Sequence, residues 1–289
     1  MSDKAVKYQI YGVLFQVLCL TANIIAIFFL ILLLTDILSK GADKLSWDFI
    51  VNYPSRHPEK SGIISALSGT AVMMILTSIM AIPLGVGGAI YLEEYARKSR
   101  FVNFIKLNIQ NLAGVPSIVY GILGLTLFVR GLDLGRSILA GSMTMALLIL
   151  PIITISSQEA IKAVPDSFRL AGFGIGMTRW QVVRYQTIPI ALPGIMTGII
   201  LALSRAIGES APMIMIGALA FVAYIPTSPM DLFTVLPIQI FNWTARPQAA
   251  FHDIAAAGII VLLFVLLLMN AIAIYIRMKY KKKYKHLYN

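Results

Sequence analysis

The sequence contains few charged residues and only one cysteine. Of its 289 residues, 13% are charged and 58% are hydrophobic, whereas soluble globular proteins have about 25% and 45–50%. So little charge cannot cover the surface of a soluble fold of this size, which excludes a soluble enzyme and a disordered protein. Cys19 has no second cysteine to pair with, which excludes a disulfide scaffold. The class that remains is a polytopic helical membrane protein.

The sequence also lacks a phosphate-binding loop for ATP. It contains no Gly-x4-Gly-Lys-Ser/Thr segment and no Gly-Lys dipeptide. The run Gly172-x-Gly174-x-Gly176 follows no predicted strand, so it is not a dinucleotide fingerprint. The histidines and Cys19 show no metal-ligand spacing. We therefore expect neither an enzyme nor a metal or cofactor site, and any ATP must be hydrolysed by another chain.

Six apolar stretches are long enough to cross a membrane, for which a helix needs about 20 residues. They cover about 13–37, 63–92, 105–129, 138–157, 191–222 and 254–276. The first is too long for a cleaved signal peptide and is predicted to be an uncleaved signal-anchor helix. No repeat or soluble domain is visible, so residues 1–289 are predicted to form one transmembrane domain.

The positive charges predict the orientation of these spans. With six spans both termini lie on one side of the membrane. If that side is the cytoplasm, the inner segments hold 15 Lys and Arg residues and the outer loops hold 7. Because cytoplasmic loops collect Lys and Arg, both termini are predicted to be cytoplasmic. This pattern also explains the net charge of +11 without nucleic-acid binding.

Prolines occur near the middle of several predicted spans, at Pro83, Pro116, Pro151 and Pro212. Proline removes a backbone hydrogen bond, and membranes tolerate the resulting break where protein or a water-lined cavity satisfies the freed carbonyl. Close helix packing by the neighbouring small residues is the alternative explanation. Several irregular helices at similar depth are what a translocation path requires.

The inner loop 158–190 is too polar to span a membrane and too short to be a domain. Phe168, Ala171 and Gly172 recur at helical spacing. Gly176 then permits a sharp exit from the helix. This pattern predicts a short cytoplasmic helix that lies in the groove of a partner protein.

The only ion pair deep in an apolar run is predicted between Arg205 and Glu209, four residues apart on one helical face. Ser204 and Ser210 add hydroxyl groups beside it. Two interpretations remain open. The pair can be a structural lock against another helix. Alternatively, Arg205 can bind an anion at two points while Glu209 accepts a hydrogen bond from the proton that phosphate still carries and repels sulfate, which has none.

The inner loop resembles the signature loop of the type I ABC importer permeases, the MetI-like family. That signature reads Glu-Ala-Ala-x3-Gly-x9-Ile-x-Leu-Pro. Here Leu170-Ala171-Gly172 stands at the first triplet, and nine residues separate Gly176 from Gln186-Thr-Ile-Pro189. Three further segments resemble the phosphate-importer permeases of the PstA family: Gly114-Val-Pro-Ser-Ile-Val-Tyr-Gly121, Arg205-Ala-Ile-Gly-Glu-Ser-Ala-Pro212 and Asn242-Trp-Thr-Ala-Arg-Pro-Gln248.

This resemblance implies an all-α fold of six transmembrane helices with a cytoplasmic coupling helix, in a prokaryotic inner membrane. It implies phosphate import together with a second permease (PstC-like), two copies of an ATPase (PstB-like) and an extracytoplasmic phosphate-binding protein (PstS-like). The expected substrate-path residues are Arg205, Glu209, Ser204, Ser210 and Ser117. The expected ATPase-coupling residues are Phe168, Arg169, Leu170, Ala171, Gly172, Gly176 and Arg179.

Three alternative functions share parts of this pattern. The same fold can carry another oxyanion such as sulfate or molybdate. A self-sufficient secondary transporter predicts an internal repeat of the spans, which the sequence lacks. A protein that signals phosphate status is compatible with transport.

Overall fold

The computed structural model describes residues 3–218 and 221–283, and in these ranges the chain is helical apart from connecting loops. Within them the only strand-like pairing is one bridge between Ser137 and Leu232. The α-helices are α1 (Asp3–Gly41), α2 (Trp47–Val51), α3 (Ile64–Ile90), α4 (Arg100–Ala113), α5 (Ser117–Gly124), α6 (Ile138–Lys162), α7 (Asp166–Gly174), α8 (Arg179–Val182), α9 (Ile188–Ile207), α10 (Ala211–Ile216), α11 (Leu236–Thr244) and α12 (Ala249–Lys283). Three π-helical turns, η3 (Tyr91–Tyr95), η4 (Leu125–Gly131) and η5 (Val183–Thr187), adjoin them.

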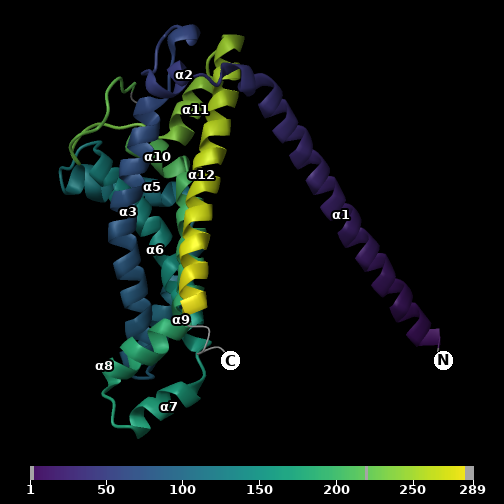
Figure 1. Cartoon of the computed structure of the whole chain (residues 1–289), viewed down its shortest axis with the longest axis vertical. Coiled ribbons are helices and arrows are strands. Elements are labelled where there is room, and N and C mark those ends of the chain that lie inside the picture. The colour runs from purple at the N-terminus through teal and green to yellow at the C-terminus, as the bar shows by residue number, and fades with distance from the viewer. Residues whose placement is uncertain (1–2, 219–220, 284–289) are drawn as a thin grey trace.

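Helix α6 forms the centre of the bundle and packs between α3 and α9. Small residues allow this close approach. A methyl group on Gly194 of α9 would lie 2.7 Å from Ala160 Cβ, and one on Gly85 of α3 would lie 2.7 Å from Ile153 Cγ2. Met145 of α6 is fully buried. The core of the protein is therefore the three-helix contact around α6, with α12 packed on α9 and α11 (Figure 1).

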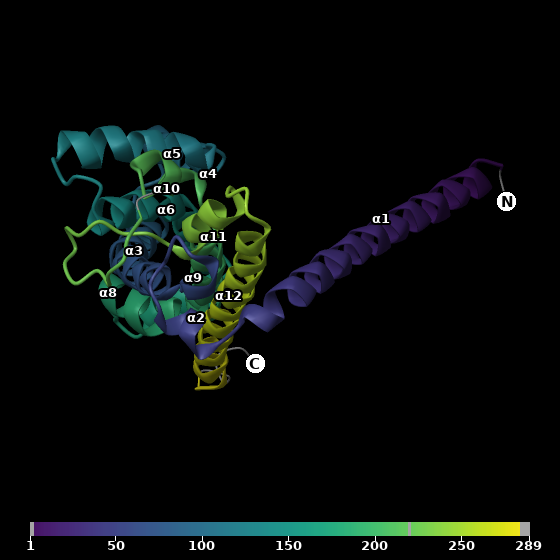
Figure 2. The same cartoon turned by 90° about the horizontal axis from the view of Figure 1, so that it is seen from above.

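Helix α1 stands apart from this bundle (Figures 1 and 2). It contacts α12 at its carboxyl end, where a methyl group on Gly41 would lie 2.7 Å from the backbone of Ala256. The apolar side chains along the rest of the helix, such as Phe15 and Phe29, are exposed within this chain. An apolar helix of this length is compatible with lipid around it rather than with water.

Within the described residues, five single helices are long and apolar enough to span a membrane, and a sixth span is formed if one bent pair is counted. The predicted span 105–129 is that pair. Helix α4 and the segment Ser117–Gly131 meet at an angle of 102°. Pro116 lies between them, and it has no N–H to continue the helix and disfavours helical backbone in the residue before it.

The predicted span 191–222 is also interrupted. Helix α9 ends at Ile207, and α10 begins only at Ala211 with Pro212 as its second residue. Figure 1 shows that α1 begins and α12 ends at the same end of the molecule as α7. The inner loop and both ends of the described chain therefore lie on one side of the bundle.

Candidate translocation path and coupling surface

The two interrupted spans meet in the fold. Helix α5 packs against α10, and the two are neighbours in both views (Figures 1 and 2). A methyl group on Gly121 of α5 would lie 2.7 Å from Pro212 Cα and 2.9 Å from Met215 Cβ of α10. The α4–α5 break and the α9–α10 break are nearly a hundred residues apart in sequence. The contact between α5 and α10 places them next to each other.

Arg205 and Glu209 lie at the α9 break. Arg205 is in the last turn of α9, whereas Glu209 follows the C-cap residue Gly208. The expectation that both lie on one helix face is therefore wrong, because the helix ends between them. Arg205 Nε is 3.9 Å from Glu209 Oε2, and the two side chains are 49% and 18% exposed. At this distance the pair is loose, so most of the guanidinium remains available to another partner.

The Ser204 side chain contacts α12 and not the Arg205–Glu209 pair. Its hydroxyl hydrogen-bonds with Asn270 Oδ1 of α12 at 2.5 Å and with its own helix at the Ile200 carbonyl at 2.7 Å. Seven residues earlier on α9, Thr197 Oγ1 accepts a hydrogen bond of 2.9 Å from Arg277 of α12. These two contacts fix how α9 and α12 align along their length. The Ser204 hydroxyl therefore lies in the contact between α9 and α12. Arg205 is the next residue in the sequence.

Ser117 and Ser210 lie at the starts of the two helices that follow the breaks. Both are half-buried, and among the described residues neither hydroxyl has a hydrogen-bond partner. The neighbouring Tyr120 hydroxyl donates to the Leu112 carbonyl at 2.8 Å, which braces the bend between α4 and α5. The next residue, Gly121, packs against Pro212 in the segment that follows Arg205 and Glu209. Arg205, Tyr120 and the α4–α5 bend therefore belong to one region.

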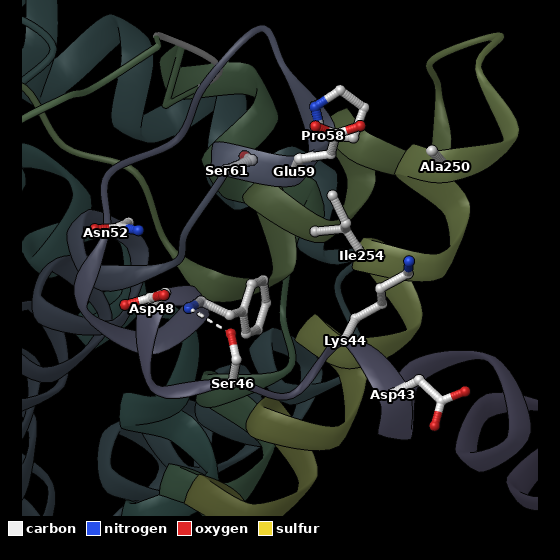
Figure 3. A pocket seen from close by; sticks show the side chains of 11 residues that line it. Asp43, Lys44, Ser46, Asp48, Asn52, Pro58, Glu59, Ser61, Ala250 and Ile254 are labelled. Carbon is white, nitrogen blue, oxygen red and sulfur yellow. Dashed lines mark hydrogen bonds between the residues drawn. The ribbon is translucent and has the colours of Figure 1, made fainter.

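A separate cavity of about 400 Å³ lies at the opposite end of the molecule from α7 (Figures 1 and 3). The Ser46 hydroxyl caps α2 there by accepting a hydrogen bond from the Phe49 N–H. The charged residues that line the cavity are Asp43, Lys44, Asp48 and Glu59. Three carboxylates against one ammonium group repel anions. This cavity is therefore unsuited to an oxyanion.

At the α7 end, Arg169 is turned into the protein. Its Nε and Nη2 donate to Glu94 Oε1 of η3 at 3.1 and 2.9 Å. It also donates to the carbonyls of Ile161 and Val164 at the end of α6 and to Asp166 Oδ1 of α7. The side chains of Arg169 and Glu94 are 18% and 8% exposed. Arg169 thus ties the coupling helix to α3 and α6, and little of it is left for a partner protein.

The exposed apolar residues of this region form a coupling surface, which we define as Leu170, Phe173, Ile175 and Trp180. Leu170 and Phe173 are three residues apart on α7 and share a face. The chain then turns through Gly176, whose φ of +81° is a left-handed conformation that favours glycine. Figure 1 shows α7 projecting beyond the end of the bundle, where a partner can reach it.

The other expected coupling residues have different surroundings. Phe168 is half-buried against the main core, and Gly172 is buried against Val182. The guanidinium of Arg179 lies 5.5 Å from the ring centre of Tyr95. Ala171 is exposed beside Leu170. Sequence reasoning omitted Phe173 from the contact residues, although its three-residue spacing from Leu170 was visible.

Comparison with known proteins identifies the family. Residues 81–282 match the family described as "Binding-protein-dependent transport system inner membrane component". The chain belongs to this family. As such, it is a multi-pass membrane protein and the membrane component of a binding-protein-dependent transport system.

Relatives of this inner membrane component extend over most of its length. It is 33% identical over 263 residues to the "Probable ABC transporter permease protein YqgI" of Bacillus subtilis, which covers 86% of this chain and 90% of the relative. It is 31% identical over 265 residues to the "Phosphate transport system permease protein PstA" of Yersinia pestis, which covers 89% and 86%.

Solved structures have the same fold. A bacterial alginate ABC transporter in complex with a pentasaccharide-bound periplasmic protein matches with a TM-score of 0.67 at 16% identity, over 94% of both chains. The MetNI methionine ABC transporter in an inward-facing conformation matches with a TM-score of 0.60 at 18% identity, over 76% of this chain and 94% of the other. At sequence identities this low, the similarity to these two transporters shows a shared fold alone. The all-α MetI-like permease fold expected from the sequence is confirmed.

Proposed function

We propose that this inner membrane component is a permease subunit of an ATP-driven phosphate importer and forms half of its translocation path. The supporting observation is the position of Arg205. Its side chain is half-exposed and, among the described residues, has one loose acidic partner, Glu209, at the place where two interrupted spans meet. Relatives named as phosphate permeases align with this chain over most of its length.

The chemistry of this region suits phosphate. The planar guanidinium of Arg205 offers two parallel N–H groups to two phosphate oxygens. Glu209 lies close enough to accept a hydrogen bond from an oxygen that still carries a proton. Phosphate at neutral pH has such a proton and sulfate has none, so the carboxylate favours the first and repels the second. The free hydroxyls of Ser117 and Ser210 supply further hydrogen bonds.

Transport in this proposal needs four kinds of chain. A second, PstC-like permease completes the path on the open side of Arg205. A pair of PstB-like ATPase subunits binds the coupling surface of α7, and a PstS-like phosphate-binding protein docks at the opposite end. Because Arg169 joins α7 to η3 and the end of α6, movement of the ATPases reaches the bundle through this residue.

Both termini are proposed to be cytoplasmic, in a prokaryotic inner membrane. Two observations support this orientation. The predicted inner segments hold an excess of positive charge, and α7 lies at the same end as the start of α1 and the end of α12. A protease-sensitive tag after Asn289 tests it in sealed inverted vesicles. Cleavage of the tag is expected. Protection of the tag would place the coupling surface on the wrong side for an ATPase.

The function itself is tested by uptake in proteoliposomes that contain the whole importer, with ATP inside and the phosphate-binding protein outside. Labelled phosphate is expected to accumulate only with ATP. Excess sulfate or molybdate is expected to leave the rate unchanged. ATP-dependent uptake of sulfate, with none of phosphate, would refute the proposed substrate while leaving the family assignment intact.

A further inference from the structure

Helix α4 carries a polar stripe that the bundle does not cover. Asn103 and Gln110 are seven residues apart and almost aligned along the helix, and Asn111 lies on the same side across the exposed Leu107. All three side chains are exposed, whereas Ile105 and Ile109, on the side that packs against α6, are half-buried. Because α4 belongs to a candidate membrane span, the amides of this stripe need a polar environment that this chain does not provide.

The hydrogen bonds of α4 distinguish these three amides from Asn108, which lies three residues before Asn111 at the edge of the same side. One N–H of the Asn108 side chain donates to the Phe104 carbonyl of its own helix at 2.8 Å. Part of the hydrogen-bonding capacity of Asn108 is therefore met within the helix. The side chains of Asn103, Gln110 and Asn111 make no hydrogen bond to any described residue. They are oriented for contact with water or with a polar solute.

The stripe leads to the region of Arg205. Its line continues through Gly114 to the α4–α5 bend, where Ser117 has a free hydroxyl. The Tyr120 hydroxyl joins this bend to the last turn of α4, and the next residue, Gly121, packs against Pro212 in the segment that follows Arg205 and Glu209. A helix of 14 residues rises about 20 Å, so α4 covers most of the distance from the α7 end of the bundle to the bend.

We propose that Asn103, Gln110 and Asn111 form one wall of an aqueous path that joins the Arg205 region to the side of the membrane where α7 lies. Amide N–H groups donate hydrogen bonds to an oxyanion without holding it as tightly as a fixed cation does. The identity of the anion rests on the proposed phosphate function, whereas the presence of water along this face of α4 does not.

Thiol labelling tests the path, and the single cysteine simplifies it. In the assembled importer with Cys19→Ser, single cysteines replace Asn103, Gln110 or Asn111. Phe101 and Leu112 are replaced as controls, because they are exposed on the other edge of α4, next in depth to Asn103 and Asn111. A charged, membrane-impermeant methanethiosulfonate is added to inverted vesicles. Reaction at the three stripe positions is expected to be roughly ten-fold or more faster than at the controls, because the reagent travels in water and not in lipid.

Two patterns of labelling would overturn the proposal. Equal rates at Asn111→Cys and Leu112→Cys would show that the stripe does not face water differently from its neighbour. Reaction at Asn103→Cys alone would show that no continuous path reaches the bend. Protection of the stripe cysteines by sulfate but not by phosphate would leave the path standing and refute the phosphate assignment.

A transport measurement gives a second, independent arm. Gln110→Leu removes the amide at nearly constant size and is expected to lower the uptake rate several-fold without reducing ATPase association. Asn108→Leu removes an amide that already bonds to its own helix and is expected to transport at the rate of the unmodified importer. Unchanged uptake by Gln110→Leu would contradict a role for this side chain in the path.

Discussion

The Arg169 guanidinium of α7 and the Glu94 carboxylate of η3 form a double hydrogen bond through one carboxylate oxygen, at 2.9 and 3.1 Å. Glu93, the adjacent residue, pairs at 2.7 Å with Lys106 of α4. Two consecutive carboxylates thus connect the coupling helix and the helix that leads to the α4–α5 bend. A shift of α7 is transmitted toward the translocation path through these contacts.

The first prediction concerns this joint. Arg169→Ala leaves Glu94 buried without its partner, which costs about 3–5 kcal/mol for a broken buried pair. The purified importer is expected to lose thermal stability and substrate-stimulated ATP hydrolysis. Asp166→Asn is the matched control, because Asp166 is the exposed partner of the same arginine and such pairs contribute about 1 kcal/mol or less. Equal effects of both substitutions would contradict the transmitting role of Glu94.

The second prediction concerns the coupling surface. Leu170→Asp places a charge where an apolar side chain is exposed, so the isolated permease is expected to insert and fold normally. Association with the ATPase subunits, measured by co-purification, is expected to fall at least about ten-fold. Leu170→Met keeps an apolar side chain of similar size at the same position and is expected to leave association unchanged. Normal association of Leu170→Asp would remove Leu170 from the interface.

The third prediction separates two glycines of the same turn. Gly176 has a φ of +81°, so Gly176→Ala strains the backbone by about 1–2 kcal/mol. Gly174 has open space around it and no positive φ, so Gly174→Ala is accommodated. We expect ATPase association to weaken with Gly176→Ala only, as measured by co-purification. The same loss in both variants would show that backbone conformation at Gly176 is not the cause.

The fourth prediction decides between the two interpretations of Arg205. Because its pair with Glu209 is 3.9 Å long and half-exposed, the double substitution Arg205→Leu with Glu209→Leu is expected to change stability by about 1 kcal/mol or less. Assembly and basal ATP hydrolysis are therefore expected to persist. Phosphate uptake in proteoliposomes is expected to be lost. Uptake near the unmodified rate would establish a structural lock and eliminate contact with the anion.

The fifth prediction concerns the alignment of α9 on α12. Asn270→Leu removes the partner of Ser204, and such hydrogen bonds between membrane helices contribute about 0.6 kcal/mol on average. A small loss of stability is expected together with a larger loss of uptake, because Arg205 adjoins this contact. Ser204→Ala combined with Asn270→Leu is expected to behave as Asn270→Leu alone. Additive losses would show that the two residues act separately.

The candidate site could be predicted from the sequence in part. The proline-containing segments and the Arg205–Glu209 spacing indicated where the chain is irregular and charged. The sequence did not indicate that Ser204 faces α12, because Asn270 is 66 residues away in the chain. The sequence pattern also placed Arg169 among the ATPase-coupling residues. Local spacing does not show that Glu94, 75 residues away in the chain, is the partner of Arg169.

Composition and hydrophobic run length by themselves determined that this chain is a helical membrane protein, because both follow from the cost of placing polar groups and backbone in lipid. Of the prolines in the predicted spans, Pro116 and Pro212 mark breaks, whereas α3 and α6 continue through Pro83 and Pro151. Only the tertiary structure decided that the α4–α5 break lies beside the α9–α10 break and that Arg169 points inward. These relations depend on packing between residues far apart in sequence, such as Gly121 against Pro212, and no local pattern encodes them.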